Sequence, residues 1–85
     1  MTGGIVTTDT LATSTPFTAS QTGLAVDLTG GGGTLADATV DTDISGNITA
    51  VTITTPGSGY AVGNIITVNE TAGPGVGTFR VASVA

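Results

Sequence analysis

The chain has 85 residues and contains neither histidine nor cysteine, so the commonest general base, the thiolate nucleophile and the usual zinc ligands are missing. Six acidic residues against a single basic one give a net charge of −5, which leaves too few cations for binding nucleic-acid phosphates or anionic lipid. We therefore expect a protein that is not an enzyme, that binds neither nucleic acid nor membrane, and that has no catalytic residue, cofactor or metal.

The composition favours a folded β domain. Only 8% of the residues are charged while 39% are hydrophobic, which is the reverse of the balance in disordered chains. Threonine is abundant and stiff at χ1, which suits a pleated sheet, and the 14 glycines break helices and serve turns. A chain of this length has a thin core and no disulfide, so we expect it to gain stability from association with a partner.

The first segment, residues 1–22, is rich in Thr and Ser and has little periodicity. We interpret it as an extended N-terminal arm with short extended pieces around Ile5-Val6 and Leu11-Ala12. Pro16 interrupts any regular element there, because proline removes a backbone donor and restricts the residue before it. Residues 23–85 form the predicted β module.

The module begins with Leu24, Val26 and Leu28, whose alternation with more polar residues predicts a half-buried strand. The glycine run 30–33 then predicts a flexible connection or a tight bend. The clearest strand follows, since its apolar and polar residues occupy opposite faces. Its apolar face consists of Ala36, Ala38, Val40 and Ile44, and its polar face of Asp37, Thr39, Asp41 and Asp43.

Two hairpins are predicted after this strand. Gly46-Asn47 separates two β runs and predicts a two-residue hairpin turn, and Pro56-Gly57 fits a type II turn that we expect to form a second hairpin. Between them, the run 48–54 changes its apolar phase at Ala50-Val51, which predicts either a bulge or a strand covered on both faces. Strands over 65–68 and 79–84 complete an all-β fold, a small antiparallel β-sandwich or partly open barrel of five to seven strands.

Carboxylates are the remaining candidates for chemistry. Paired carboxylates need a deep, dry cleft to shift a pKa, which so short a chain can hardly build. Asp37, Asp41 and Asp43 could coordinate calcium together with Glu70 or a backbone carbonyl, but the spacing lacks the Asp-x-Asp-x-Asp-Gly loop. The solvated face of a strand is the interpretation that we favour for them.

Two other residues have alternative roles. Tyr60 follows a tight turn, where its ring can pack over the turn or contact a partner, and we favour packing. Arg80 is the one cation, and we expect it to pair with an aspartate, either within the fold or across an interface.

The motif Pro56-Gly57-Ser58-Gly59-Tyr60, between the Val/Ile/Thr strand at 48–54 and the strand at 65–68, resembles a β module of virion structural proteins in tailed bacteriophages, those of cyanobacterial phages above all. The closing Gly77-Thr78-Phe79-Arg80-Val81 is similar to the Gly-Thr-rich return of that module. The resemblance covers the chain from about residue 31 to residue 84. It implies a virion structural protein of a bacteriophage.

Within that class, the short chain favours a capsid decoration or cement protein on the outer surface of the shell. The alternative is a tail, baseplate or fibre component that contacts a host surface or neighbouring tail proteins. The expected partners are the major capsid protein and copies of the chain itself, with a homotrimer favoured. Sheet edges without lysine are poorly protected against strand addition, so we expect contact through such edges and through the N-terminal arm.

Overall fold

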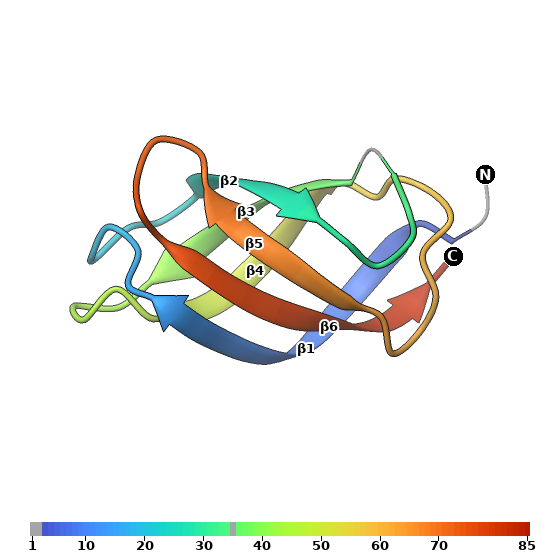
Figure 1. Cartoon of the computed structure of the whole chain (residues 1–85), viewed down its shortest axis with the longest axis horizontal. Coiled ribbons are helices and arrows are strands. Elements are labelled where there is room, and N and C mark those ends of the chain that lie inside the picture. The colour runs from blue at the N-terminus through green and yellow to red at the C-terminus, as the bar shows by residue number, and fades with distance from the viewer. Residues whose placement is uncertain (1–2, 35) are drawn as a thin grey trace.

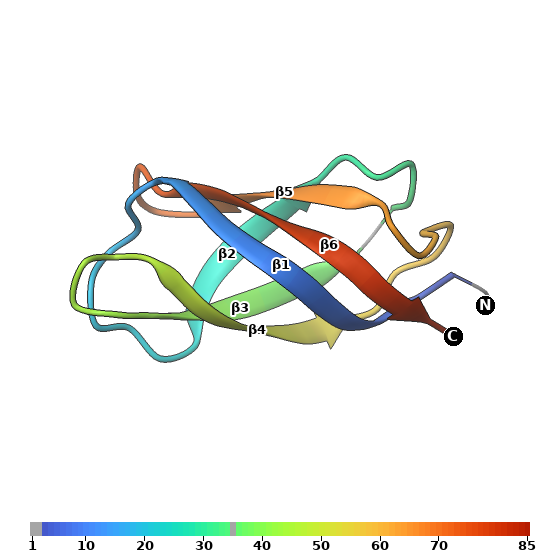
Figure 2. The same cartoon turned by 90° about the horizontal axis from the view of Figure 1, so that it is seen from below.

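The computed structural model describes residues 3–34 and 36–85, which form one antiparallel sheet (Figure 1). Its strands are β1 (Ile5–Thr15), β2 (Leu24–Thr29), β3 (Asp37–Thr42), β4 (Ile48–Thr55), β5 (Ile65–Glu70) and β6 (Val76–Val84). The strand order is β1-β6-β5-β2-β3-β4, and the sheet curls until its two edge strands face each other (Figure 2). The all-β prediction is confirmed, in the form of a nearly closed barrel. The described residues include no helix long and apolar enough to cross a membrane.

Alternate residues of the strands fill the inside of the barrel. In β5, Ile66, Val68 and Glu70 are buried while their neighbours in the strand are more accessible, as the period of two requires. Each fully buried aliphatic or aromatic side chain stabilises the fold by about 1.5–3 kcal/mol. Among the described residues, five hydrophobic ones have no exposed surface: Val40, Ile66, Val68, Phe79 and Val81.

The edge strands β1 and β4 are joined at both ends of the seam between them. The Ile5 N–H donates to the Pro56 carbonyl at 2.9 Å, and the Ile48 N–H donates to Thr13 Oγ1 at 3.0 Å. Over the described residues no ladder pairs the two strands. Because each edge is turned toward the other, neither has the open approach that strand addition to a flat sheet requires.

The sequence interpretation set residues 1–22 apart as an arm, but in the described part of this segment, residues 3–22, the structure shows no separation from the module. Ile5–Thr15 is β1, which pairs along β6, and both Ile5 and Phe17 belong to the core. The register of β1 against β6 shifts at four places. These shifts remove the regular alternation that marks a strand, which explains why the sequence looks aperiodic.

One residue of the predicted strand face is placed wrongly by the sequence. Ala38 and Val40 point into the core as expected, but Ile44 is 86% exposed, because β3 ends at Thr42 and Ile44 lies in the turn that follows. The predicted bulge in β4 exists, although one residue earlier than the phase change suggested. Asp41 pairs with Ala50 and Thr42 pairs with Ile48, which leaves Thr49 as the additional residue.

The first predicted hairpin is present, although its connection is longer than the expected two residues Gly46-Asn47, and the second is wrong. Residues 43–47 join β3 to its antiparallel partner β4, with Gly46 in the left-handed region at φ 81°. After Pro56-Gly57, however, the chain leaves β4 and crosses to β5, whose partners are β2 and β6. The turn bonds other segments instead of closing a hairpin. Ser58 forms an antiparallel bridge with Thr34, and the Pro56 carbonyl accepts from Ile5.

Candidate interaction surface

The carboxylates at one end of the barrel hold its loops in place. Asp43 Oδ1 accepts the N–H groups of Ser45 and Asn47, both at 2.9 Å, and Asp41 Oδ1 accepts the Gly23 N–H at 3.0 Å. Hydrogen bonds to the Asp43 carboxylate lower its pKa below the usual value, and the bond from the Asn47 N–H has the largest effect. These acids therefore act as local caps of turns.

The acidic residues considered as calcium ligands are not brought together. Asp43 is folded back onto its own turn, and Glu70 lies on another strand with its carboxylate on Thr18. Among residues 3–34 and 36–85, no three His, Cys, Asp or Glu side chains are placed so that they could hold a metal ion. The structure thus offers no ligand set in the part of the chain that it describes.

Glu70 has a role that the sequence interpretation missed. Its side chain is buried, and its two oxygens accept the Thr18 N–H at 2.9 Å and the Thr18 hydroxyl at 2.7 Å. A Cβ on Gly73 would overlap this carboxylate, so glycine there leaves room for the Glu70 side chain to stay on Thr18. The signal was present in the sequence, because the alternation of β5 places Glu70 in phase with the buried Ile66 and Val68.

Tyr60 is buried, which confirms the packing role expected for it. Its ring lies so close to Gly33 that a Cβ at that position would overlap it, so the glycine run 30–33 is in part a packing surface. Phe17 and Phe79, the other two aromatic residues of the chain, are buried as well. No aromatic ring is therefore left on the surface to stack on a sugar.

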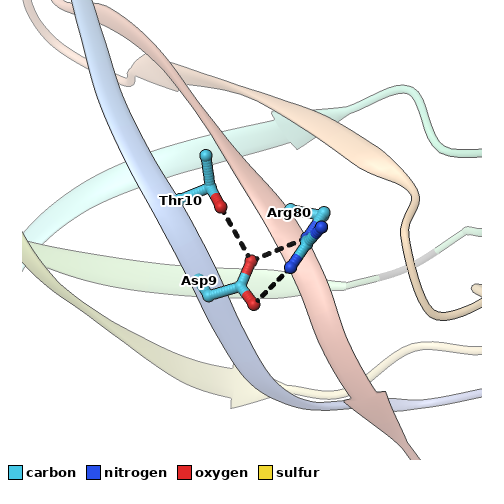
Figure 3. Close-up of polar contacts among 3 residues, drawn as sticks. All are labelled: Asp9, Thr10 and Arg80. Atoms are coloured by element: carbon cyan, nitrogen blue, oxygen red, sulfur yellow. Dashed lines mark hydrogen bonds and ion pairs between the residues drawn. The ribbon is translucent and has the colours of Figure 1, made fainter.

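Arg80 pairs within the fold, which settles the alternative left open by the sequence. Arg80 on β6 lies opposite Asp9 on β1, and its Nε and Nη2 donate to the two carboxylate oxygens, both at 2.8 Å (Figure 3). Hydrogen bonding to Arg80 is the main cause that lowers the pKa of Asp9, and the same contact raises the pKa of Arg80. Both side chains remain roughly half exposed, at 41% and 49%.

A bulge in β1 directly follows Asp9, the ladder partner of Arg80. Asp9 pairs with Arg80 and Ala12 with Thr78, so two residues of β1, Thr10 and Leu11, lie opposite one residue of β6. Thr10 has a φ of 52°, in the left-handed region, which costs an L-residue with a Cβ about 1–2 kcal/mol. Its hydroxyl donates to Asp9 Oδ1 at 3.1 Å, as Figure 3 shows.

One exposed aliphatic side chain, that of Ile65, lies beside this ion pair. The large hydrophobic residues exposed in the described chain are Val6, Ile44, Val62 and Ile65. Ile65 is the ladder partner of Arg80 on β5, and Val6 lies on β1 three residues before Asp9. The turn that carries Val62 is bound to β6, since the Gly63 N–H donates to the Val81 carbonyl at 2.8 Å.

Comparison with known proteins adds no relative. No family model matches the chain, and neither the curated proteins nor the solved structures that were searched give a match.

Proposed function

We propose that this chain is a virion structural protein, a capsid decoration or cement protein that binds the outer surface of the shell and stabilises it. The observation that carries the proposal is that several charged side chains of the chain form hydrogen bonds within its own fold. Asp41, Asp43 and Glu70 hold loops, and Asp9 holds Arg80, so these charged side chains are bound within the fold of a small compact body. Such a body suits a protein that occupies a site on an assembly.

Charge supports a basic partner surface. The net charge is −5, and the one cation is already paired with Asp9. The outer side of β2 and β3 carries Asp27, Asp37 and Asp41. A shell surface rich in Lys and Arg would attract these acids over a distance of about 8 Å at physiological salt. Binding to particles should therefore weaken as the salt concentration rises.

The experiment is to add the purified chain to bacteriophage particles that lack it and to measure co-sedimentation and the thermal stability of the particles. We expect saturable binding and a higher melting temperature of the shell. Copy number distinguishes the tail alternative, because a decoration protein is present in hundreds of copies while tail, baseplate and fibre parts occur in small multiples of three or six. A count of the second kind, or no binding at low salt, would contradict the decoration role.

A further inference from the structure

We propose that the middle of β1 is a strap that opens while the rest of the barrel stays folded. The strap is residues 6–12, which lie between two anchored ends of the β1 segment. The proposal goes beyond the proposed function, because it concerns the chain alone and does not require a particle. Its consequence is that the edge of β6 is covered in the closed form and free in the open form.

Both ends of the β1 segment are held by the core and by bonds to other parts of the chain. Ile5 is 1% exposed, and its N–H donates to the Pro56 carbonyl at 2.9 Å. At the other end, Thr13 Oγ1 accepts a backbone N–H of β4 at 3.0 Å. Just beyond it, the buried Phe17 donates its N–H to the Gly46 carbonyl at 2.9 Å. Opening of the strap leaves all of these contacts in place.

Between these ends, β1 buries little. None of residues 6–12 is buried, whereas the neighbouring strand β6 contributes Phe79 and Val81, which have no exposed surface. From the strap, Leu11 packs against the core, and it is only partly buried. Separating the strap from the sheet therefore exposes little apolar surface, and loss of apolar burial is the main cost of opening a segment.

The ladder that holds the strap on β6 is interrupted. Three of its four register shifts fall between Ile5 and Ala12, and each disrupts the regular pairing with β6. On the other side of β1, no ladder joins the strap to β4 over the described residues. The strap is therefore held by fewer backbone hydrogen bonds than a central strand, which pairs on both of its sides.

The remaining contacts of the strap are exposed or strained. The ion pair between Asp9 and Arg80 is exposed, and exposed pairs contribute little to stability. The hydrogen bond of 2.7 Å between Thr7 Oγ1 and Ser83 Oγ is exposed as well. Thr10 has a φ of 52°, and its strain is relieved when the strap opens. The closed strap is thus favoured by less free energy than the packed core, as in segments that open without global unfolding.

Opening of the strap changes what the barrel presents to solvent. In the closed form, β1 covers the edge of β6 and Asp9 binds Arg80 (Figure 3). In the open form, the edge of β6 and the Arg80 guanidinium are both free. The strap thus restricts an edge that could accept another strand to a minor population of molecules.

The test is native-state hydrogen exchange of the purified full chain, followed for single backbone amides by NMR in increasing urea below the unfolding transition. We expect the protected amides of the strap to exchange at least about tenfold faster than those of β5. Their rates should hardly depend on urea, because opening of the strap exposes little surface. The amides of Ile5 and Phe17 should exchange as slowly as those of β5, since the anchors stay closed.

Two variants separate opening of the strap from unfolding of the whole chain. Ile66→Val shortens a side chain that has no exposed surface and lies on β5, which is not a ladder neighbour of β1. It should speed exchange of the β5 amides by about two- to tenfold and leave the strap amides unchanged, because only global unfolding breaks the packing of Ile66. Leu11→Ala should speed both sets of amides, because Leu11 leaves the core in either event. Circular dichroism establishes that both variants are folded.

Strap amides that share the rate and the urea dependence of the β5 amides would overturn the proposal, because β1 would then open only with the whole chain. An equal response of both sets to Ile66→Val has the same meaning. Amides of Ile5 and Phe17 that exchange as fast as the strap would show that the entire strand detaches, and strap amides unaffected by Leu11→Ala would contradict the proposed opening. Binding to particles is measured separately by co-sedimentation and does not depend on these outcomes.

Discussion

Replacing Thr18 by valine tests the contact that ties the segment between β1 and β2 to the end of β5. Valine has nearly the shape of threonine but lacks the hydroxyl that donates to Glu70 Oε2 at 2.7 Å. A hydrogen bond to a charged group contributes about 1.5–3 kcal/mol, and Thr18 itself is exposed, so we expect a loss near the lower end, about 2 kcal/mol. For a domain of this size that corresponds to a melting temperature lower by roughly 8–16 °C.

The assay is thermal unfolding followed by circular dichroism at neutral pH. Thr52→Val is the matched control, because Thr52 is exposed on β4 and has no side-chain hydrogen bond to the described part of the chain, so its melting temperature should change little. A Glu70→Gln chain completes a double-mutant cycle, and the two changes should be coupled by more than about 0.5 kcal/mol. Equal melting temperatures for Thr18→Val and Thr52→Val would refute the reasoning.

Three further predictions concern the acids, the core and the first strand. The pKa values of Asp9 and Asp43 are lowered in the folded chain, so their contribution to stability is complete above the unfolded pKa near 4 and is lost as the pH falls through the folded values. Urea unfolding from pH 7 down to pH 2 should show this loss, and Asp43→Asn should make the profile less steep below pH 4. Phe79 has no exposed surface, so Phe79→Ala should lower the free energy of unfolding in urea by about 3–5 kcal/mol. An equal loss for Thr78→Ala would contradict the assignment of Phe79 to the core. Deletion of residues 1–20 removes β1 and Phe17, so we expect an unfolded chain by circular dichroism, and a folded truncated chain would show that β1 is dispensable.

Local patterns in the sequence determined the fold class and several of its parts. The alternation in β2 and β3, the abundance of threonine and glycine, and the Gly46 turn each act over a few residues, which is the range at which backbone preference and side-chain period operate. Tyr60 was expected to pack for the same reason, since the turn just before it brings the backbone close to its ring. The inventory of residue types also bounds the chemistry without reference to any fold.

The tertiary structure decided how these parts meet. Asp9 and Arg80 are 71 residues apart, and only the pairing of β1 with β6 places them opposite each other. That pairing made the N-terminal segment a strand, although its bulges had hidden the period of two. The crossing after Pro56 followed from the closure of the barrel, because β5 had to join β2 and β6, which a local turn preference cannot specify. Likewise, Ile44 is in phase with the apolar residues of β3 in the sequence, but it is exposed because β3 ends at Thr42. Contacts between distant strands define the core, and the pattern of one strand alone does not show where that strand ends.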